Sequence, residues 1–207
     1  MKKIAATIVF FSLFLSFSAL SATEEEDIFA TRLYNQALTL LSSAKPQCRE
    51  LKQKNKALTN AVSELYKKAL QHKNAATNVF ANADYLLKFL QERIDETCGL
   101  VEIANEESVK IIIAQEFDQL LSKRRQSANL EEFIDKIFGT EYGKLLYLAT
   151  SVSSLEKMYT KWAKKMISEK NDLKKTIANI ADANTELKKE LTDFTKTFKI
   201  YYEKTTK

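Results

Sequence analysis

A scarcity of turn-forming residues constrains this chain more than any other feature. Its 207 residues include three glycines and one proline, all of them after residue 22, where average usage would give about 13 and about 9. Sheets depend on frequent turns, and turns need residues that accept a positive φ or have a preset φ. We therefore predict an all-α protein made of long helices with few, tight connections.

The first 22 residues have the three parts of a secretory signal peptide. Residues 1–3 are positively charged, residues 4–17 are almost wholly apolar, and residues 18–22 are mostly small. The apolar part is too short to cross a bilayer, which takes about 20 residues. We predict cleavage after Ser21 or Ala22 and a secreted or periplasmic protein; an uncleaved membrane anchor is the alternative.

Basic and acidic residues are interspersed through the rest of the chain. The formal charge is +5, or +3 once Lys2 and Lys3 are removed with the signal peptide. Nucleic-acid-binding proteins usually concentrate basic residues on one face, whereas here the one basic triplet is Lys123-Arg124-Arg125. The pattern indicates solvated helix surfaces and no nucleic-acid partner.

Apolar residues recur at helical spacing after residue 22. They predict a single all-helical domain, residues 23–207, with helices over about 23–44, 47–72, 75–98, 100–125, 129–138 and 144–203. Thr23 and Glu26 form a capping box for the first helix, and Pro46 is expected to end it. Gly99 is expected just beyond the third helix. Three isoleucines, Ile111 to Ile113, predict that the fourth helix is the most buried.

Cys48 and Cys98 are the two cysteines, and an even number in an exported protein favours a disulfide. A single helix from one to the other would hold them about 75 Å apart, whereas a disulfide needs α-carbons within about 7 Å. Their midpoint, residue 73, lies in a patch rich in asparagine and threonine, which are poor helix formers. A hairpin closed by the disulfide is favoured over a single rod, which remains the alternative.

The strongest heptad pattern covers the last predicted helix, residues 144–203, with one stutter at Lys170. Small residues flank its seam where a parallel zipper would carry charged pairs, so we expect an intramolecular antiparallel bundle, packed against parts of 48–98 and 100–125. Asn55 and Asn184 occupy seam positions, where polar residues commonly fix the register of helices. The oligomeric state is left open.

Catalytic and cofactor chemistry has little support in the sequence. The single histidine, His72, excludes a zincin motif, and the glycines are too few for a phosphate-binding loop. Acidic pairs such as Glu106-Glu107 resemble ordinary solvated helix surface, although an enzyme with acids in a cleft is a third reading. We predict no catalytic residue, no metal, no cofactor and no enzymatic activity.

Aromatic residues crowd the C-terminal turns: Phe194, Phe198, Tyr201 and Tyr202. They form either the closed end of the bundle or a tip that faces a partner protein or a membrane surface.

Taken together, these features predict an exported, non-enzymatic helical bundle that acts by protein–protein interaction. An envelope component, a secretion apparatus and a host-facing surface are the settings that we consider. The alternative is a membrane-active protein, pore-forming or lipid-binding, in which the helix with Ile111 to Ile113 inserts into lipid.

Overall fold

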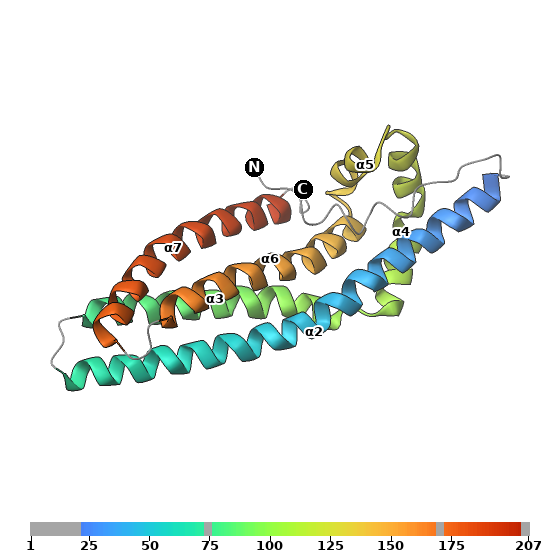
Figure 1. Ribbon diagram of the computed structural model, residues 1–207. Coiled ribbons are helices and arrows are strands. Elements are labelled where there is room, and N and C mark those ends of the chain that lie inside the picture. The colour runs from blue at the N-terminus through green and yellow to red at the C-terminus, as the bar shows by residue number, and fades with distance from the viewer. Residues whose placement is uncertain (1–21, 73–75, 169–171, 204–207) are drawn as a thin grey trace.

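The computed structural model describes residues 22–72, 76–168 and 172–203, and of residues 22, 23 and 198–203 it describes the backbone alone (Figure 1). Its helices are α2 (Ala22–Gln71), α3 (Thr77–Ile103), α4 (Glu106–Arg125), α5 (Leu130–Ile137), α6 (Glu141–Ile167) and α7 (Leu173–Glu203). The described residues contain no strand, so the predicted all-α class is confirmed. The predicted signal peptide lies outside the described residues except for Ala22.

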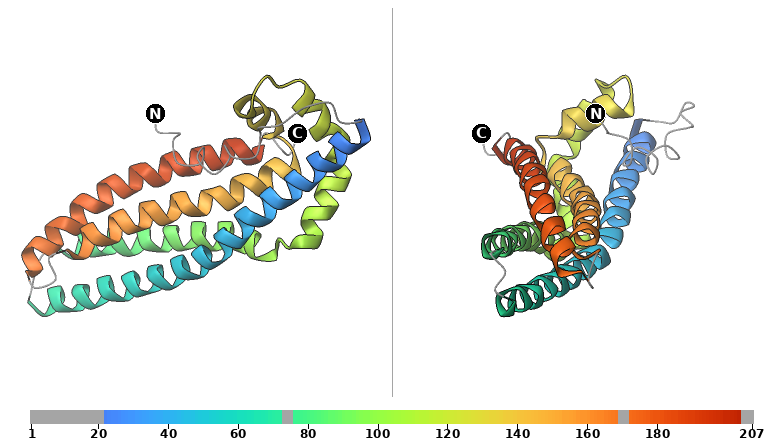
Figure 2. Two further views of the ribbon diagram at one scale, coloured as in Figure 1. Left: turned by 45° about the vertical axis from the view of Figure 1, so that its right-hand side comes forward. Right: turned by 60° about the vertical axis from the view of Figure 1, so that its left-hand side comes forward.

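Four of these helices, α2, α3, α6 and α7, form an elongated bundle (Figures 1 and 2). The pairs α2–α3 and α6–α7 each run antiparallel, α6 packs against α2, and α3 contacts the other three. One end is extended by α4 and α5, which pack on α2 and α6. The predicted intramolecular bundle is therefore confirmed: of the two helices within 144–203, α6 packs against α2, α3 and α4, and α7 packs against α3.

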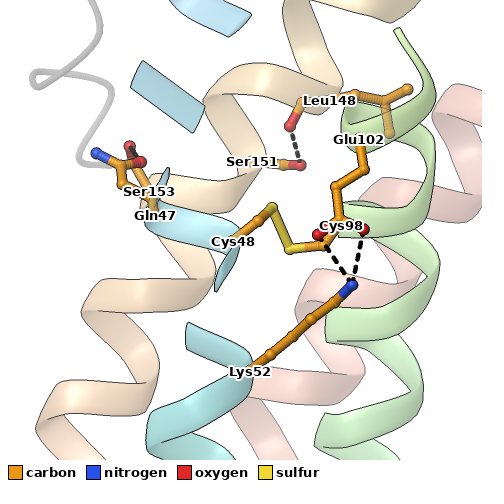
Figure 3. Close-up of a disulfide and its surroundings, with 8 residues drawn as sticks. All are labelled: Gln47, Cys48, Lys52, Cys98, Glu102, Leu148, Ser151 and Ser153. Atoms are coloured by element: carbon orange, nitrogen blue, oxygen red, sulfur yellow. Dashed lines mark hydrogen bonds and ion pairs between the residues drawn. A yellow bond between two sulfur atoms is a disulfide. The ribbon is translucent and has the colours of Figure 1, made fainter. Parts of the chain in front are cut away.

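The hairpin between the two cysteines is confirmed, and the single-rod alternative is wrong. Helix α2 ends at Gln71 and α3 begins at Thr77; residues 73–75 of the turn lie outside the described residues. Cys48 and Cys98 are joined with α-carbons 5.5 Å apart and are fully buried (Figure 3). The disulfide closes the open end of the hairpin.

Two lysines on the same stripe of α2 as Cys48 reinforce this closure. Lys45 Nζ donates to the carbonyl oxygen of Ala104 at 2.5 Å, just beyond the end of α3. Lys52 Nζ lies 3.1 Å from the Glu102 carboxylate (Figure 3). The covalent bond and the two polar contacts hold the last turns of α3 against α2.

Pro46 does not end a helix, contrary to the prediction: α2 runs through it as one helix. A proline inside a helix removes one hydrogen bond and clashes with a carbonyl four residues earlier, at a cost of about 3 kcal/mol or more. Buried residues on both sides, Leu41, Ala44, Cys48 and Leu51, keep the two halves of α2 in the core. Tertiary packing and the nearby disulfide outweigh the local signal.

Gly99 lies inside α3 and not beyond it, which also differs from the prediction. The helix continues for four residues because Val101 is fully buried on the same face as Cys98. The chain leaves the helix at Ala104 instead, and Asn105 caps α4 by accepting a hydrogen bond from the Ser108 N–H at 2.8 Å. The boundary is set by an N-cap asparagine rather than by the glycine.

The predicted 144–203 helix is two helices. Helix α6 ends at Ile167, α7 begins at Leu173, and the chain reverses between them (Figure 1). The stutter in the sequence falls at Lys170, and residues 169–171 lie outside the described residues. A heptad pattern shows only which stripe of a helix is apolar. One continuous helix that packs on a partner buries this stripe, and so do two helices that fold onto each other, so the pattern does not distinguish the two.

The prediction that the 100–125 region is the most buried is wrong. Helix α4 buries Val109, Ile113 and Leu120, whereas Ile111 is 47% exposed. Helix α4 lies at one end of the bundle, with α2, α5 and α6 against it, so part of its isoleucine stripe faces solvent. The central helix is α6, whose buried residues include Leu145, Val152, Leu155, Tyr159, Trp162 and Met166.

The start of α6 is fixed by contacts from α4 and α5. The Glu116 carboxylate accepts the N–H groups of Glu141 and Tyr142 at 2.8 and 2.9 Å, and Thr140 Oγ1 accepts the N–H of Gly143 at 3.0 Å. Gly143 lets α6 approach the end of α5: a Cβ atom there would overlap the Ile137 carbonyl oxygen and lie 2.8 Å from its carbonyl carbon. Together these contacts set the direction in which α6 leaves α5.

Two glycine substitutions should therefore have opposite effects. Gly143→Ala should lower the free energy of unfolding by about 1–3 kcal/mol, because the new methyl group overlaps the α5 backbone. Gly99→Ala should raise it by about 0.5–1 kcal/mol, because nothing lies within 4 Å of the added atom and alanine favours the helix. Urea unfolding followed by circular dichroism measures both, and equal effects would contradict the close approach of α5 and α6.

The disulfide yields a second stability prediction. Replacing both Cys48 and Cys98 by serine should lower the free energy of unfolding by about 2–4 kcal/mol, because the unfolded chain is no longer closed into a loop. Non-reducing peptide mapping of the purified protein should first show the 48–98 linkage. Two free thiols in the protein recovered from its native compartment would overturn the assignment.

Candidate functional site

Helices α6 and α7 are held together by a ladder of polar contacts near their connection. Lys165 Nζ lies 2.8 Å from Glu186, and Lys161 Nζ lies 2.5 Å from Glu190. Glu190 also accepts the indole N–H of Trp162 at 2.9 Å, and Trp162 is almost fully buried. These contacts position the first half of α7 along α6.

One helical turn further along α7, this series of polar contacts ends and a groove begins. Lys157 and Asp193 occupy the next step, but no ion pair joins them in the described part of the chain. A groove of about 950 Å³ begins at this point, with α6 as its floor and α2 and α7 as its walls. It is lined by Leu40, Ser43, Ala44, Gln47, Tyr147, Ala149, Thr150, Ser151, Ser153, Ser154, Glu156, Lys157, Thr160, Asp193, Phe194 and Thr197.

The ribbons show how the walls lie. Viewed with the left side turned forward, α7 and the first half of α2 lie on opposite sides of α6 (Figure 2, right). The far end of the groove lies at Tyr147, whose ring makes an edge-on contact with Phe138, the C-cap residue of α5, with centroids 5.9 Å apart. Helix α5 is therefore next to one end of the groove.

Small side chains and hydroxyl groups make up the floor. Thr150 and Ser151 donate to carbonyl oxygens of α6 itself, at 2.9 and 2.8 Å. Ser153 Oγ lies 3.1 Å from the Gln47 side-chain oxygen and so links the floor to the α2 wall. Because these three hydroxyls bond within the protein, they add little polarity to the floor.

The α2 wall and most of the floor of the groove carry no charged side chain, in a chain of which 29% of residues are charged. After residue 23, the two longest runs without a charged residue are 33–44 and 145–155. The first supplies the α2 wall and the second the floor. Charged lining residues, Glu156, Lys157 and Asp193, gather at the end near the ladder. The structure thus brings two separate uncharged segments together on one surface.

The residues singled out from the sequence lie elsewhere, with one exception. Asn55 is fully buried and donates to Gln91 at 2.8 Å, which joins α2 to α3. Asn184 donates to the carbonyl oxygen of Val79 at 3.1 Å, which joins α7 to α3. The exception is Phe194, which is partly buried and lines the groove. The side chains of Phe198, Tyr201 and Tyr202 lie outside the described residues.

The groove was not predicted from the sequence, although the two uncharged runs that form it are visible there. The two uncharged runs stand out against the surrounding charge, but nothing in a single sequence says that they meet. Their contact depends on α2 and α6 lying side by side and on α7 leaving α6 after Glu190, both of which are results of packing.

Two tyrosines of α6, neither of which lines the groove, have structural roles. Burial raises the pKa of the Tyr142 and Tyr159 hydroxyls, which keeps them protonated as donors to the carbonyl oxygens of Leu33 and Lys54 at 2.8 and 2.6 Å. His72 is exposed at the end of α2. Within residues 22–72, 76–168 and 172–203, three or more His, Cys, Asp or Glu side chains do not gather as a metal site.

Comparison with known proteins identifies no relative. The chain matches no protein-family model, no curated protein and no solved structure. A search of the described helices finds none long and apolar enough to cross a membrane.

Proposed function

We propose that this protein is an exported, non-enzymatic helical bundle that acts by protein–protein interaction, and that the groove along α6 is its docking surface. The observation that carries the proposal is the convergence of two uncharged segments, 33–44 and 145–155, on one open groove. Exposed helix surfaces are normally charged, so a groove whose α2 wall and most of whose floor carry no charged side chain favours a surface that is covered part of the time.

The shape of the groove favours a helix as the bound element. The walls are two helices and the floor between them consists mostly of small residues, and a helix in a groove is a common mode of peptide recognition. Small residues such as Ala149, Ser151 and Ser154 allow the backbone of a docked helix to approach closely. Leu40 on the α2 wall, Phe194 on the α7 wall and Tyr147 at the end of the floor supply apolar contact.

Export is supported by the charged, apolar and small-residue segments of residues 1–22. The fully buried Cys48–Cys98 bond adds to this support, because such bonds persist in oxidising compartments. An envelope component, a part of a secretion apparatus or a host-facing protein would all fit.

The membrane-active alternative has less support. Insertion of a hairpin into lipid requires helices that separate easily, whereas α2 and α3 are joined covalently near the α4 end of the hairpin. In α4, Val109, Ile113 and Leu120 are buried in the core, and so extracting this helix would expose apolar surface on α2 and α6 as well.

Site-specific photo-crosslinking tests the proposal. A photoreactive amino acid replaces Ser154, an exposed residue on the groove floor, or Thr185, an exposed residue of α7 outside the groove. In the native compartment, Ser154 should give an adduct with a protein and Thr185 should not. Ser43→Arg on the α2 wall should reduce the Ser154 adduct at least about tenfold, because it introduces an unpaired charge into the contact.

Ala57→Arg, at an exposed position of α2 outside the groove, is the matched control and should leave the adduct unchanged. Equal crosslinking from positions 154 and 185, no protein adduct from 154, or adducts with lipid alone would contradict a protein-docking groove.

A further inference from the structure

The two walls of the groove are attached to its floor in different ways. On one side, Tyr142 and Tyr159 of α6 donate hydrogen bonds to backbone carbonyl oxygens of α2 at 2.8 and 2.6 Å, and the disulfide joins α2 to α3. On the other side, α7 packs against α3 and α6 (Figure 2). Both cysteines of the chain form the α2–α3 bond, so α7 is held by side-chain packing and polar contacts without a covalent cross-link.

The packing of α7 includes several small or polar side chains. Thr176 and Asn184 are buried in its seam, and a polar residue at a seam position lowers stability. Asn184 donates to the Val79 carbonyl oxygen, but its Oδ1 has no hydrogen-bond partner, and the buried Thr195 Oγ1 has none either. Buried polar atoms without partners weaken packing. The buried apolar side chains of the described part of α7 are Ile180, Ala183, Leu187 and Leu191.

The part of α7 that lines the groove is held least. Of the side chains that the structure describes after Leu191, those of residues 192–197, none is fully buried. The wall residues Asp193, Phe194 and Thr197 all belong to this part. The position of the wall therefore depends on how the preceding turns of α7 are attached.

The polar attachment of those turns is centred on Trp162. Its indole N–H donates to Glu190 at 2.9 Å, and the centre of its ring lies 4.2 and 5.4 Å from the ammonium groups of Lys161 and Lys165. Lys161 in turn pairs with Glu190, and Lys165 with Glu186. We call these residues the α7 anchor.

The contacts of the α7 anchor differ in strength. Both ion pairs are partly exposed to solvent, so their contribution is small and is screened by salt. The hydrogen bond from the buried Trp162 indole to the Glu190 carboxylate is charge-assisted and therefore stronger. Glu190 is thus the residue on which the polar attachment of α7 depends most.

We propose that α7 is a releasable wall: it detaches from α3 and α6 as a unit in a minor state, and the groove holds its partner only while α7 is docked. This inference rests on the groove being a protein-docking surface and adds how its occupancy is controlled. Proteins open locally in cooperative units, and units with few buried apolar contacts open first. A partner that contacts both walls binds the docked state, so binding and α7 docking favour each other.

Native-state hydrogen exchange, read by mass spectrometry of the processed, disulfide-bonded protein, measures the opening of α7. After correction for intrinsic rates, amides of residues 176–191 should exchange at least about tenfold faster than those of residues 86–98 of α3, next to the disulfide. Raising the NaCl concentration from about 20 mM to about 500 mM should speed exchange in α7 about threefold and leave the α3 segment unchanged, because salt screens the ion pairs of the anchor.

Two substitutions should change α7 exchange in opposite directions. Glu190→Ala removes the acceptor of the Trp162 N–H and should speed exchange at least about tenfold. Asn184→Leu replaces a buried amide in the seam by an apolar side chain and should slow exchange at least about threefold. Glu64→Ala, which removes an exposed α2 carboxylate paired with Lys67, is the matched control and should leave α7 unchanged. Circular dichroism verifies that each variant folds.

The Ser154 photo-adduct tests the coupling between α7 and the groove. In the purified adduct, amides of residues 176–191 should exchange at least about tenfold more slowly than in the free protein, because the bound partner stabilises the docked state. Exchange of residues 86–98, which do not line the groove, should stay the same.

Equal exchange of α7 and the α3 segment in the free protein overturns the releasable wall, as do rates that Glu190→Ala and Asn184→Leu leave unchanged. An adduct in which α7 exchanges as in the free protein overturns the coupling. Failure of the proposed function is a separate result, since exchange in the free protein needs no partner. Absence of any protein adduct from Ser154 rejects the docking groove, and the coupling with it, even where α7 opens as expected.

Discussion

Closure of the α2–α3 hairpin is the constraint on which the rest of the structure depends. The Cys48–Cys98 bond, the Lys45 contact to Ala104 and the Lys52–Glu102 pair fix the place where α3 ends and α4 begins. They do so within two turns of Pro46, where α2 lacks a backbone hydrogen bond. The turn of the 50-residue helix that lacks a backbone hydrogen bond is therefore next to the disulfide, the covalent link between α2 and α3.

Helix α6 is built onto this closed hairpin. Its tyrosines, Tyr142 and Tyr159, donate to α2 carbonyl oxygens on either side of the disulfide, at Leu33 and Lys54. With α6 fixed against α2 at both points, the outer face of α6 has a defined position. Helix α7 follows α6 as far as Glu190 and then leaves it, so the same face becomes the floor of the groove. Packing at the disulfide and the shape of the candidate site are therefore linked through α6.

Local chemistry and spacing predicted much of the fold. The few turn residues indicated helices, the equal distances of Cys48 and Cys98 from residue 73 indicated a hairpin, and apolar spacing indicated a short helix over 129–138. In the structure Asn129 accepts the Glu132 N–H at 2.9 Å, and α5 spans Leu130–Ile137 as expected within a residue. Each of these inferences needs only residues close in sequence or a distance limit on one bond.

The errors arose where tertiary packing outweighs a local signal. Pro46 and Gly99 lie inside helices because their neighbours Cys48, Cys98 and Val101 are buried. The 144–203 pattern was assigned to one helix because a heptad seam does not record the direction of the chain. The groove was missed for the same reason, since it exists only where α7 folds back beside α6 and then diverges.

The distance across the groove tests this account most directly. Spin labels at Ser154 on α6 and Thr197 on α7 lie on residues that line the same groove, while the Cys48–Cys98 bond keeps the native cysteines unreactive. With α7 folded back beside α6, pulsed electron paramagnetic resonance should give a narrow distribution of distances between the two labels. Its centre should not exceed two helix diameters, roughly 20–25 Å. A distance near 65 Å, the length of about 43 residues in one helix, would contradict the bundle and the groove together.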